Sequence, residues 1–260
     1  MAEASARRGG RGSLTVVGTG IDAVTQLTPA ARAAIETSDE VLYLVGDSVS
    51  ALRIVSLNDH ARSLDHLYGP DKDRRQTYAE IADSIVDAVV GGADVCAVFY
   101  GHPGVFAYPG HEAIARVRRA GLPARMLPAV SALDCLVADL GLDPGDTGLQ
   151  SYEATHFLLH EPPVDPQAML VLWQVGMIGE TGGAATPAVV ARFRKLVERL
   201  RDECGPERQA LLYEASPYPG GRPAVALFRL GDGDLPAPSP VSTLCVPART
   251  AAPIDVGPEG

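Results

Sequence analysis

The chain has 260 residues, of which 46% are hydrophobic, enough to bury the core of one large domain or of two modest ones. Its formal net charge of −10 argues against sequence-independent binding of nucleic acid or of an anionic membrane, because both require a basic surface. The partners that remain are small molecules and other proteins.

Nothing in the sequence predicts export or a membrane span. No apolar stretch approaches the length of a transmembrane helix, and the N-terminus lacks the apolar region of a signal peptide. Residues 1–12 are typical of a disordered leader. The cysteines are dispersed without a CxxC pair, which predicts buried free thiols in a cytoplasmic protein: Cys96, Cys135, Cys204 and Cys245.

Strand and helix patterns alternate through the first half of the chain, which predicts a parallel sheet. We expect strands at residues 14–17, 41–45, 95–99 and 124–127, and helices at residues 29–38, 47–55, 72–90, 110–120 and 131–140. Thr28 and Pro29 form a helix-start signal, and Asp71 is the expected cap of the long helix after it. The Pro-Gly-Asp-Thr-Gly run at residues 144–148 marks a candidate domain boundary.

The second half has more strands per helix, which predicts a mixed sheet. Strand patterns lie at residues 149–152, 169–175, 210–213, 224–230 and 242–246, and a helix at residues 187–203. The expected fold class is therefore α/β with two lobes: a parallel sheet at residues 13–145, a mixed sheet at residues 146–248, and a cleft between them. Residues 249–260 are expected to form a flexible tail.

A Gly- and Pro-rich loop follows the strand at residues 95–99. It reads Phe99-Tyr100-Gly101-His102-Pro103-Gly104-Val105-Phe106-Ala107-Tyr108-Pro109-Gly110. Ligands bind at the carboxyl ends of strands in open α/β sheets, and glycines let a ligand approach the backbone. The sequence therefore predicts a preformed binding loop. An ordinary strand-to-helix connection is the alternative, but it has no need of so many aromatic side chains and a histidine.

The run Gly18-Thr19-Gly20-Ile21-Asp22-Ala23 fits the dinucleotide pattern G-x-G-x-x-G/A. That fingerprint requires a helix that starts inside the motif, whereas the helix signals here come later, at Thr28 and Pro29. A nucleotide-phosphate site, and with it a dehydrogenase, is therefore the weaker hypothesis.

A second cluster combines phenols with a guanidinium. Arg74 and Tyr78 lie one turn apart on the expected long helix, and Tyr68 precedes the turn that leads into it. A guanidinium near phenols stabilises phenolate and offers donors to a developing oxyanion. The alternative is a solvated helix face, which the surrounding charges, Lys72 among them, favour.

Two further pairs suggest chemistry less strongly. His156 and His160 have the spacing of zinc ligands on one helix, but no HExxH motif or cysteine pair accompanies them, so we expect no metal. Cys135 with His102 would suggest a thiol nucleophile, but Cys135 lies on an apolar helix face, where packing explains it better.

Five segments together resemble the tetrapyrrole methylase superfamily in order and rough spacing. They are Val16-Val17-Gly18-Thr19-Gly20, Phe99-Tyr100-Gly101-His102-Pro103-Gly104-Val105-Phe106, Leu127-Pro128-Ala129-Val130-Ser131-Ala132, Trp173-Gln174-Val175-Gly176 and Ser242-Thr243-Leu244-Cys245-Val246-Pro247. More narrowly, the loop after residue 98 together with Tyr68, Arg74 and Tyr78 resembles the methyltransferase domain of borosin peptide backbone α-N-methyltransferases, the omphalotin-type maturation enzymes.

The resemblance implies S-adenosylmethionine as cofactor, bound in the cleft between the lobes, and a homodimer. It implies that the cofactor contacts Tyr100, His102, Val105, Phe106, Ser131, Ala132, Gln174, Ser242 and Thr243. It implies that the catalytic side chains facing the peptide amide are Tyr68, Arg74, Tyr78 and Tyr100. The Gly-Thr-Gly run then becomes a tight turn beside the cofactor.

An amide nitrogen is a poor nucleophile because its lone pair is delocalised into the carbonyl group. Attack on a sulfonium methyl therefore needs a group that holds charge on the carbonyl oxygen, such as Arg74 with a phenol, and a second phenol that accepts the proton, its pKa lowered by Arg74. The fungal relatives carry their substrate on a C-terminal extension. Residues 249–260 do not have the composition of such a substrate, so we expect a split system that iteratively methylates a separate precursor.

Two other functions fit the same fold. One is methylation of a tetrapyrrole, either corrin or porphyrin, or of a protein side chain; the absence of a recognisable basic patch for tetrapyrrole carboxylates speaks against the former. The other is a binding or scaffolding protein without catalysis, against which the complete set of tyrosines and arginine argues.

Overall fold

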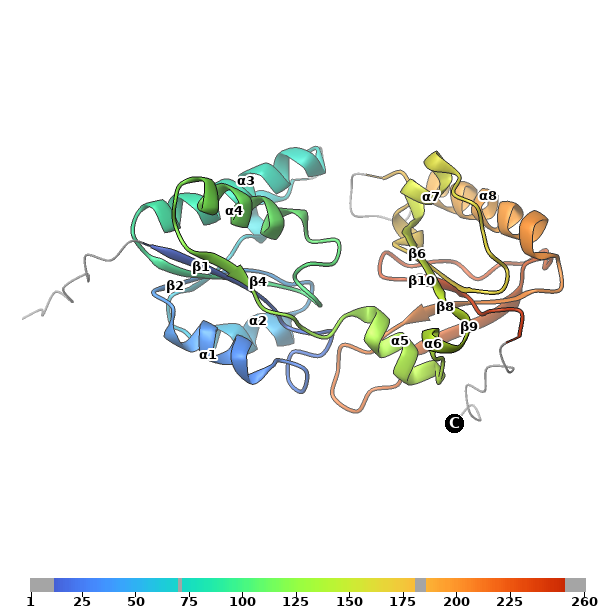
Figure 1. The fold of residues 1–260 in the computed structure, drawn as a ribbon, viewed down its shortest axis with the longest axis horizontal. Coiled ribbons are helices and arrows are strands. Elements are labelled where there is room, and N and C mark those ends of the chain that lie inside the picture. Colours follow the sequence, from blue (N-terminus) through green and yellow to red (C-terminus); the bar gives the residue numbers. More distant parts are fainter. Residues whose placement is uncertain (1–11, 70–71, 181–185, 251–260) are drawn as a thin grey trace, which may run out of the picture. The chain divides into compact units, whose positions relative to one another are not determined.

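The computed structural model describes residues 12–69, 72–180 and 186–250 (Figure 1). The expected leader and tail therefore lie almost wholly outside the described residues, and so does the expected cap Asp71. The chain divides into two compact units, the first formed by residues 1–132 with 217–219 and the second by residues 133–216 with 220–260. The short helix α6 (Pro144–Thr147) occupies the segment expected to be a domain boundary.

The first unit contains the predicted parallel sheet. All neighbouring strands are parallel, in the order β3-β2-β4-β1-β5. The strands are β1 (Ser13–Gly18), β2 (Glu40–Leu44), β3 (Ala61–Ser63), β4 (Asp94–Phe99) and β5 (Ala124–Met126). Of these strands, only β3 was not expected.

Helices cover both faces of this sheet, with α1 and α2 on one face and α3 and α4 on the other (Figure 1). Their bounds are α1 (Pro29–Thr37), α2 (Ser48–Val55), α3 (Arg74–Val90) and α4 (Tyr108–Arg119), and the 3-10 helix η1 (Asp65–Leu67) precedes α3. Along β4, Val95, Ala97 and Phe99 pack on the α3 and α4 side, whereas Cys96 and Val98 pack on the α1 and α2 side. Burial on both faces explains why this strand is a continuous apolar run.

Side-chain caps set where the helices begin. The hydroxyl of Thr28 accepts a hydrogen bond from the amide of Ala31 at 3.1 Å, as the start signal predicted for α1. For α3 the cap is Asp73, whose carboxylate accepts from the amide of Arg75 at 2.8 Å. The helix therefore begins at Arg74, two residues after the expected start, because Asp73 satisfies one of its first amides.

The second unit contains the predicted mixed sheet, in the order β6-β7-β10-β8-β9, with β6 and β7 parallel and the other pairs antiparallel. The strands are β6 (Leu149–Glu153), β7 (Met169–Trp173), β8 (Gln209–Glu214), β9 (Ala224–Arg229) and β10 (Thr243–Val246). The remaining elements are α5 (Ala132–Leu140), α7 (Ala154–His160), η2 (Val175–Met177) and α8 (Pro187–Cys204).

One apolar core holds this unit together. Phe157 of α7 and Phe193 of α8 are fully buried with Leu170 of β7 and Leu212 of β8. Helix α7 was not expected, because seven residues give too short a pattern to separate a helix from a loop. Thr186 caps α8 through its hydroxyl and Pro187 occupies the first helical position, so the helix begins where the sequence predicted.

The cysteines are all free. Cys96, Cys204 and Cys245 are buried, and burial raises the pKa of the Cys96 and Cys245 thiols to about 12, so both stay protonated at neutral pH. Cys135 lies half-buried in α5. Within the described ranges, the structure contains no helix with the length and apolar character needed to cross a membrane.

Gly18, at the end of β1, tests how tightly the sheet edge is packed. A Cβ atom added there would lie 2.0 Å from the carbonyl oxygen of Gly101. We expect Gly18→Ala to lower the free energy of unfolding by about 1–3 kcal/mol, measured by guanidinium denaturation. Gly46→Ala is the matched control, since an added Cβ has no atom within 4 Å there. Equal denaturation midpoints for the two variants would contradict the close packing.

Candidate active site

The first sheet has a topological switch point between β1 and β4. From β1 the chain runs through α1 to β2 on the far side of β4, whereas from β4 it runs through α4 to β5 on the far side of β1. The two connecting helices cover opposite faces (Figure 1). The loops that follow β1 and β4 therefore diverge at the carboxyl edge of the sheet, which is where open α/β sheets bind ligands.

Backbone hydrogen bonds join these two loops to each other. The amide of Thr19 donates to the carbonyl of Phe99 at 2.9 Å, and Gly20 and Gly101 exchange hydrogen bonds of 3.3 and 3.0 Å. The Gly-Thr-Gly run is thus a tight turn whose amides are used within the protein. Because α1 begins only at Pro29, the motif lacks the helix start that a dinucleotide site requires, and the structure does not support that hypothesis.

Two histidines hold the middle of the loop after β4. The Nδ1 atom of His102 accepts from the amide of Gly104 at 3.0 Å, so the proton of a neutral His102 ring lies on Nε2. The Nε2 atom of His111 lies 3.0 Å from the carbonyl oxygen of Gly104, to which it can only donate. Both backbone groups of Gly104 are therefore satisfied, and His102 carries a hydrogen-bond donor at Nε2.

The rest of the loop exposes apolar side chains. Phe106 has a left-handed backbone, with φ 53°, which is strained for a bulky residue. Large side chains with more than a third of their surface exposed gather in this loop and in the segment before α3: Tyr68, Tyr100, Val105, Phe106 and Tyr108. Exposed apolar groups of this kind mark binding surfaces.

Arg74 and Tyr78 lie close enough to Tyr68 to affect its ionisation. The pKa of Tyr68 is raised to about 12, first by burial and then by the nearby Tyr78, whereas Arg74 lowers it by less. Arg74 therefore lowers the pKa of Tyr68, as expected, but desolvation of the phenolate outweighs the guanidinium and the net pKa of Tyr68 is raised. The rings of Tyr78 and Tyr108 are 6.4 Å apart, which links α3 to the start of α4.

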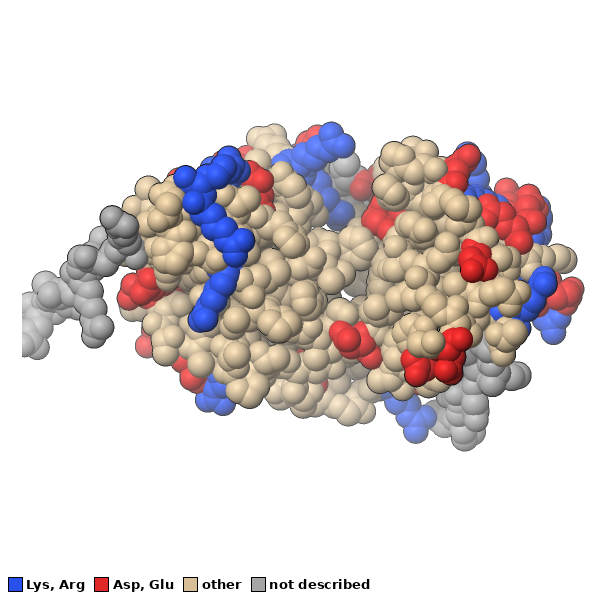
Figure 2. Space-filling model, viewed as in Figure 1, with Lys and Arg blue, Asp and Glu red and all other residues tan. Residues whose placement is uncertain are grey.

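The other expected residues of the first unit are Ser131 and Ala132, which lead from β5 into α5. Figure 2 shows basic side chains gathered over α4, whose last turn carries Arg116, Arg118 and Arg119. Arg116 pairs with Asp83 of α3 at 2.7 Å, and Arg118 donates to the carbonyl of residue 124. This basic group thus supports the fold and contains none of the expected site residues.

In the second unit, Gln174, Ser242 and Thr243 meet at one end of β7 and β10, as the antiparallel pairing of these strands requires. Gln174 is left-handed, with φ 58°. A Cβ on Gly176 would lie 1.8 Å from the carbonyl oxygen of Ser239, so the two backbones touch here.

Ser242 is fully buried, and its hydroxyl donates to the carboxylate of Glu214 while accepting from the amide of Ser239 at 2.8 Å. The hydroxyl is therefore used to hold the loop. Thr243 is also buried and pairs with Tyr213 of β8. Any ligand contact at Ser242 has to involve its backbone.

The rings of His156 and His160 stack on α7 with centroids 4.2 Å apart. Among the residues that the structure describes, no group of three or more His, Cys, Asp or Glu side chains could hold a metal ion. Two residues near the expected site received no role in the sequence analysis. Tyr108 contacts Tyr78, and its place in the loop motif was a signal for it. Lys72 contacts Leu67 and Glu80, and no motif marks it.

Comparisons with known proteins agree with this fold. A family profile described as Tetrapyrrole (Corrin/Porphyrin) Methylases matches residues 13–223. Among solved structures, the chain is similar to uroporphyrin-III-C-methyltransferase from Thermus thermophilus, with TM-score 0.62, 24% identity and 91% of this chain and 92% of that chain covered. It is also similar to the methyltransferase CobJ, with TM-score 0.66 and 18% identity, over 94% of this chain and 98% of that chain. These likenesses establish the fold alone.

Two fungal proteins are closer in sequence. The chain is 41% identical over 222 residues to the methyltransferase/ribosomally synthesized type I borosin cyclic peptide precursor of Coprinopsis marcescibilis, covering 85% of this chain and 57% of that protein. It is 39% identical over 251 residues to the methyltransferase/ribosomally synthesized cyclic peptide omphalotin A precursor of Omphalotus olearius. That match covers 94% of this chain and 60% of that protein. The chain thus spans less than two thirds of the length of these relatives.

The match from β1 to the residue before β9, together with the shared two-sheet architecture, shows that this chain belongs to the family of tetrapyrrole (corrin/porphyrin) methylases.

Proposed function

We propose that the chain is an S-adenosylmethionine-dependent methyltransferase that iteratively methylates backbone amides of a precursor peptide. The observation that carries the proposal is the position of Arg74 and Tyr78 one turn apart on α3, where both affect the ionisation of Tyr68, beside exposed aromatic side chains. Two phenols and a guanidinium are the groups that amide activation needs. The names of the two fungal relatives support a peptide as substrate.

The residues at the sheet edge fit the proposed cofactor. S-adenosylmethionine has an amino acid end, an adenosine and a sulfonium, so it needs polar contacts together with apolar surface. His102 offers a donor at Nε2, and Val105 and Phe106 offer apolar surface. The left-handed backbones of Phe106 and Gln174 are two of the three among non-glycine residues in the described ranges, and such strain is concentrated at ligand sites. When bound, the cofactor supplies an electrophilic methyl group.

The protein's own residues would then activate the amide. Tyr68, kept protonated by its raised pKa, donates a hydrogen bond to the carbonyl oxygen of the substrate. Arg74 stabilises the negative charge that develops on that oxygen. Tyr78 in its phenolate form accepts the amide proton and becomes a neutral phenol, and Tyr100 packs the peptide against the loop. Alignment of the nitrogen with the methyl group by this rigid loop supplies much of the remaining rate.

A homodimer remains our expectation from the resemblance, and a cytoplasmic location remains our expectation from the dispersed cysteines. The second candidate function, methylation of a tetrapyrrole, is favoured by family membership. A methylation assay with uroporphyrinogen separates the two, since the proposed enzyme would leave uroporphyrinogen unmodified while methylating peptide.

The catalytic roles can be tested at Arg74. We expect Arg74→Ala to lower kcat by about 100- to 1000-fold, because the charge on the carbonyl oxygen loses its guanidinium, with S-adenosylmethionine affinity retained in calorimetry. Tyr78→Phe should behave in the same way. Arg75→Ala is the matched control, since Arg75 is exposed on the same helix turn. Wild-type turnover in Arg74→Ala would refute its assigned role.

The role of Tyr68 can be tested by pH dependence. Because its pKa is raised to about 12, Tyr68 stays protonated at neutral and mildly alkaline pH. We therefore expect Tyr68→Phe to lower kcat by a constant factor between about pH 7 and pH 10, with the shape of the profile unchanged. An inflection present in the wild type but absent from Tyr68→Phe would identify Tyr68 as the base instead.

The substrate can be tested by supplying the peptide as a separate chain. A site formed by exposed side chains needs no covalent link to its substrate, so we expect methylation in trans. Co-expression with a candidate precursor should give mass increments of one or more methyl groups, which fragmentation assigns to main-chain nitrogens. Increments confined to side chains would contradict backbone methylation.

A further inference from the structure

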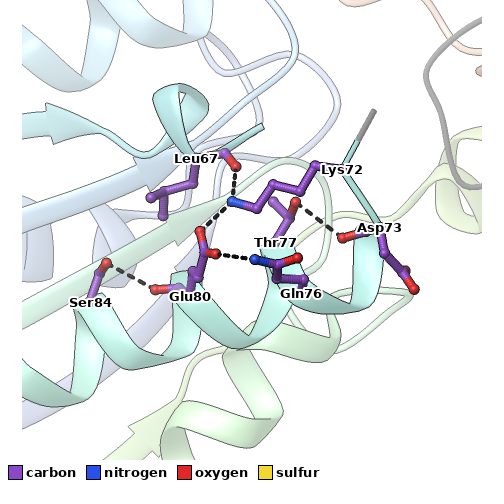
Figure 3. Close-up of polar contacts among 7 residues, drawn as sticks. All are labelled: Leu67, Lys72, Asp73, Gln76, Thr77, Glu80 and Ser84. Atoms are coloured by element: carbon purple, nitrogen blue, oxygen red, sulfur yellow. Dashed lines mark hydrogen bonds and ion pairs between the residues drawn. The ribbon is translucent and has the colours of Figure 1, made fainter. Parts of the chain in front are cut away.

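Lys72 connects η1 to α3 through two contacts (Figure 3). Its ammonium donates to the carbonyl oxygen of Leu67 at 2.7 Å and forms an ion pair with the carboxylate of Glu80. Gln76 donates to the other carboxylate oxygen of Glu80 at 3.1 Å, so Glu80 is itself held in place. Only 22% of the Lys72 side chain is exposed. Lys72 therefore ties the end of η1 to the second turn of α3.

These attachment points lie on either side of the proposed catalytic residues. Tyr68 directly follows Leu67, whereas Arg74 and Tyr78 lie on α3 before Glu80. On the other side of η1, the amide of Leu64 donates to the carbonyl oxygen of residue 43 at the end of β2, at 2.9 Å. The segment that carries Tyr68 is thus fixed both to the sheet and to the helix that carries Arg74 and Tyr78.

The use of lysine at this position is informative, because the chain contains 20 arginines and only two lysines, Lys72 and Lys195. An ammonium is compact and directs three donors to separate acceptors, here a backbone carbonyl and a carboxylate. A guanidinium holds its donors in a planar fork suited to one carboxylate. The contacts of Lys72 are those that an ammonium makes better.

We infer that Lys72 is a positioning residue, which holds Tyr68 in the orientation relative to Arg74 and Tyr78 that amide activation requires. The kinetic consequence rests on the proposed function, whereas the contact with Leu67 and Glu80 does not. The competing explanation is an ion pair that only supports α3. A partly exposed pair of that kind contributes little, and its loss would leave turnover unchanged.

The variant Lys72→Met removes the ammonium and keeps an unbranched stem. We expect it to lower kcat about 10- to 100-fold, because a small misplacement of a catalytic group is costly, with the dissociation constant of S-adenosylmethionine unchanged. Lys195→Met, at an exposed position of α8, is the matched control and should keep wild-type kcat. Wild-type kcat in Lys72→Met, or a loss matched by weaker cofactor binding, would overturn the inference.

Hydrogen exchange gives a readout that is independent of activity. The amides of Leu67 and Tyr68 are bonded within η1 at 3.0 Å, and we expect a peptide covering residues 64–69 to exchange faster in Lys72→Met but not in Lys195→Met. Unchanged exchange would overturn the inference. If the wild type methylates no peptide, the proposed function fails, and the exchange measurement still decides whether Lys72 holds this segment.

Glu80→Gln provides a second variant should Lys72→Met fail to fold. It weakens the same contact without altering Lys72, so we expect a smaller loss of kcat in the same direction. The variant that carries both substitutions should be no less active than Lys72→Met alone, because both substitutions remove the same contact between Lys72 and Glu80. Independent, multiplicative losses would show that the two residues act separately and would refute the inference.

Discussion

The exchange of backbone hydrogen bonds between Gly20 and Gly101 is the constraint on which the candidate site depends. It joins the loops that leave β1 and β4, two strands whose connections depart to opposite faces of the sheet. Because Gly18 has no room for a side chain, the two loops run in direct contact. The loop after β4 is therefore anchored at its first turn, and Tyr100 and His102 are held at the sheet edge by backbone geometry.

Electrostatics also determines the protonation of Tyr68. Burial opposes ionisation of Tyr68 more strongly than Arg74 favours it, so a phenol beside a guanidinium remains a donor. The second unit shows a comparable constraint on its backbone, where Gln174 is left-handed and Gly176 touches the chain at Ser239. A methyl transfer with strict alignment would need such fixed positions.

Much of the fold was predictable because its signals are local. Thr28 with Pro29 sets the start of α1, and the apolar run that becomes β4 reflects burial on both faces of a sheet. The sequence could not show which of two nearby aspartates caps α3, since Asp71 and Asp73 have the same chemistry. Elements as short as β3 and α7 also escaped prediction, because their few residues depend on packing against the rest of the fold.

The order of the residues was enough to predict the residue types of the candidate site and the two kinds of sheet, because periodicity and turn chemistry depend on neighbouring residues. The surroundings of those residues depend on the folded structure. Hydrogen bonding made the Gly-Thr-Gly run a turn instead of a phosphate site, and the hydroxyl of Ser242 became a loop support. Desolvation keeps Tyr68 protonated. Lys72, which the sequence placed on a solvated helix face, connects η1 to α3 through its contacts with Leu67 and Glu80. These hydrogen bonds, ion pairs and protonation states depend on burial and on contacts with distant segments of the chain. Both arise only when the chain has folded.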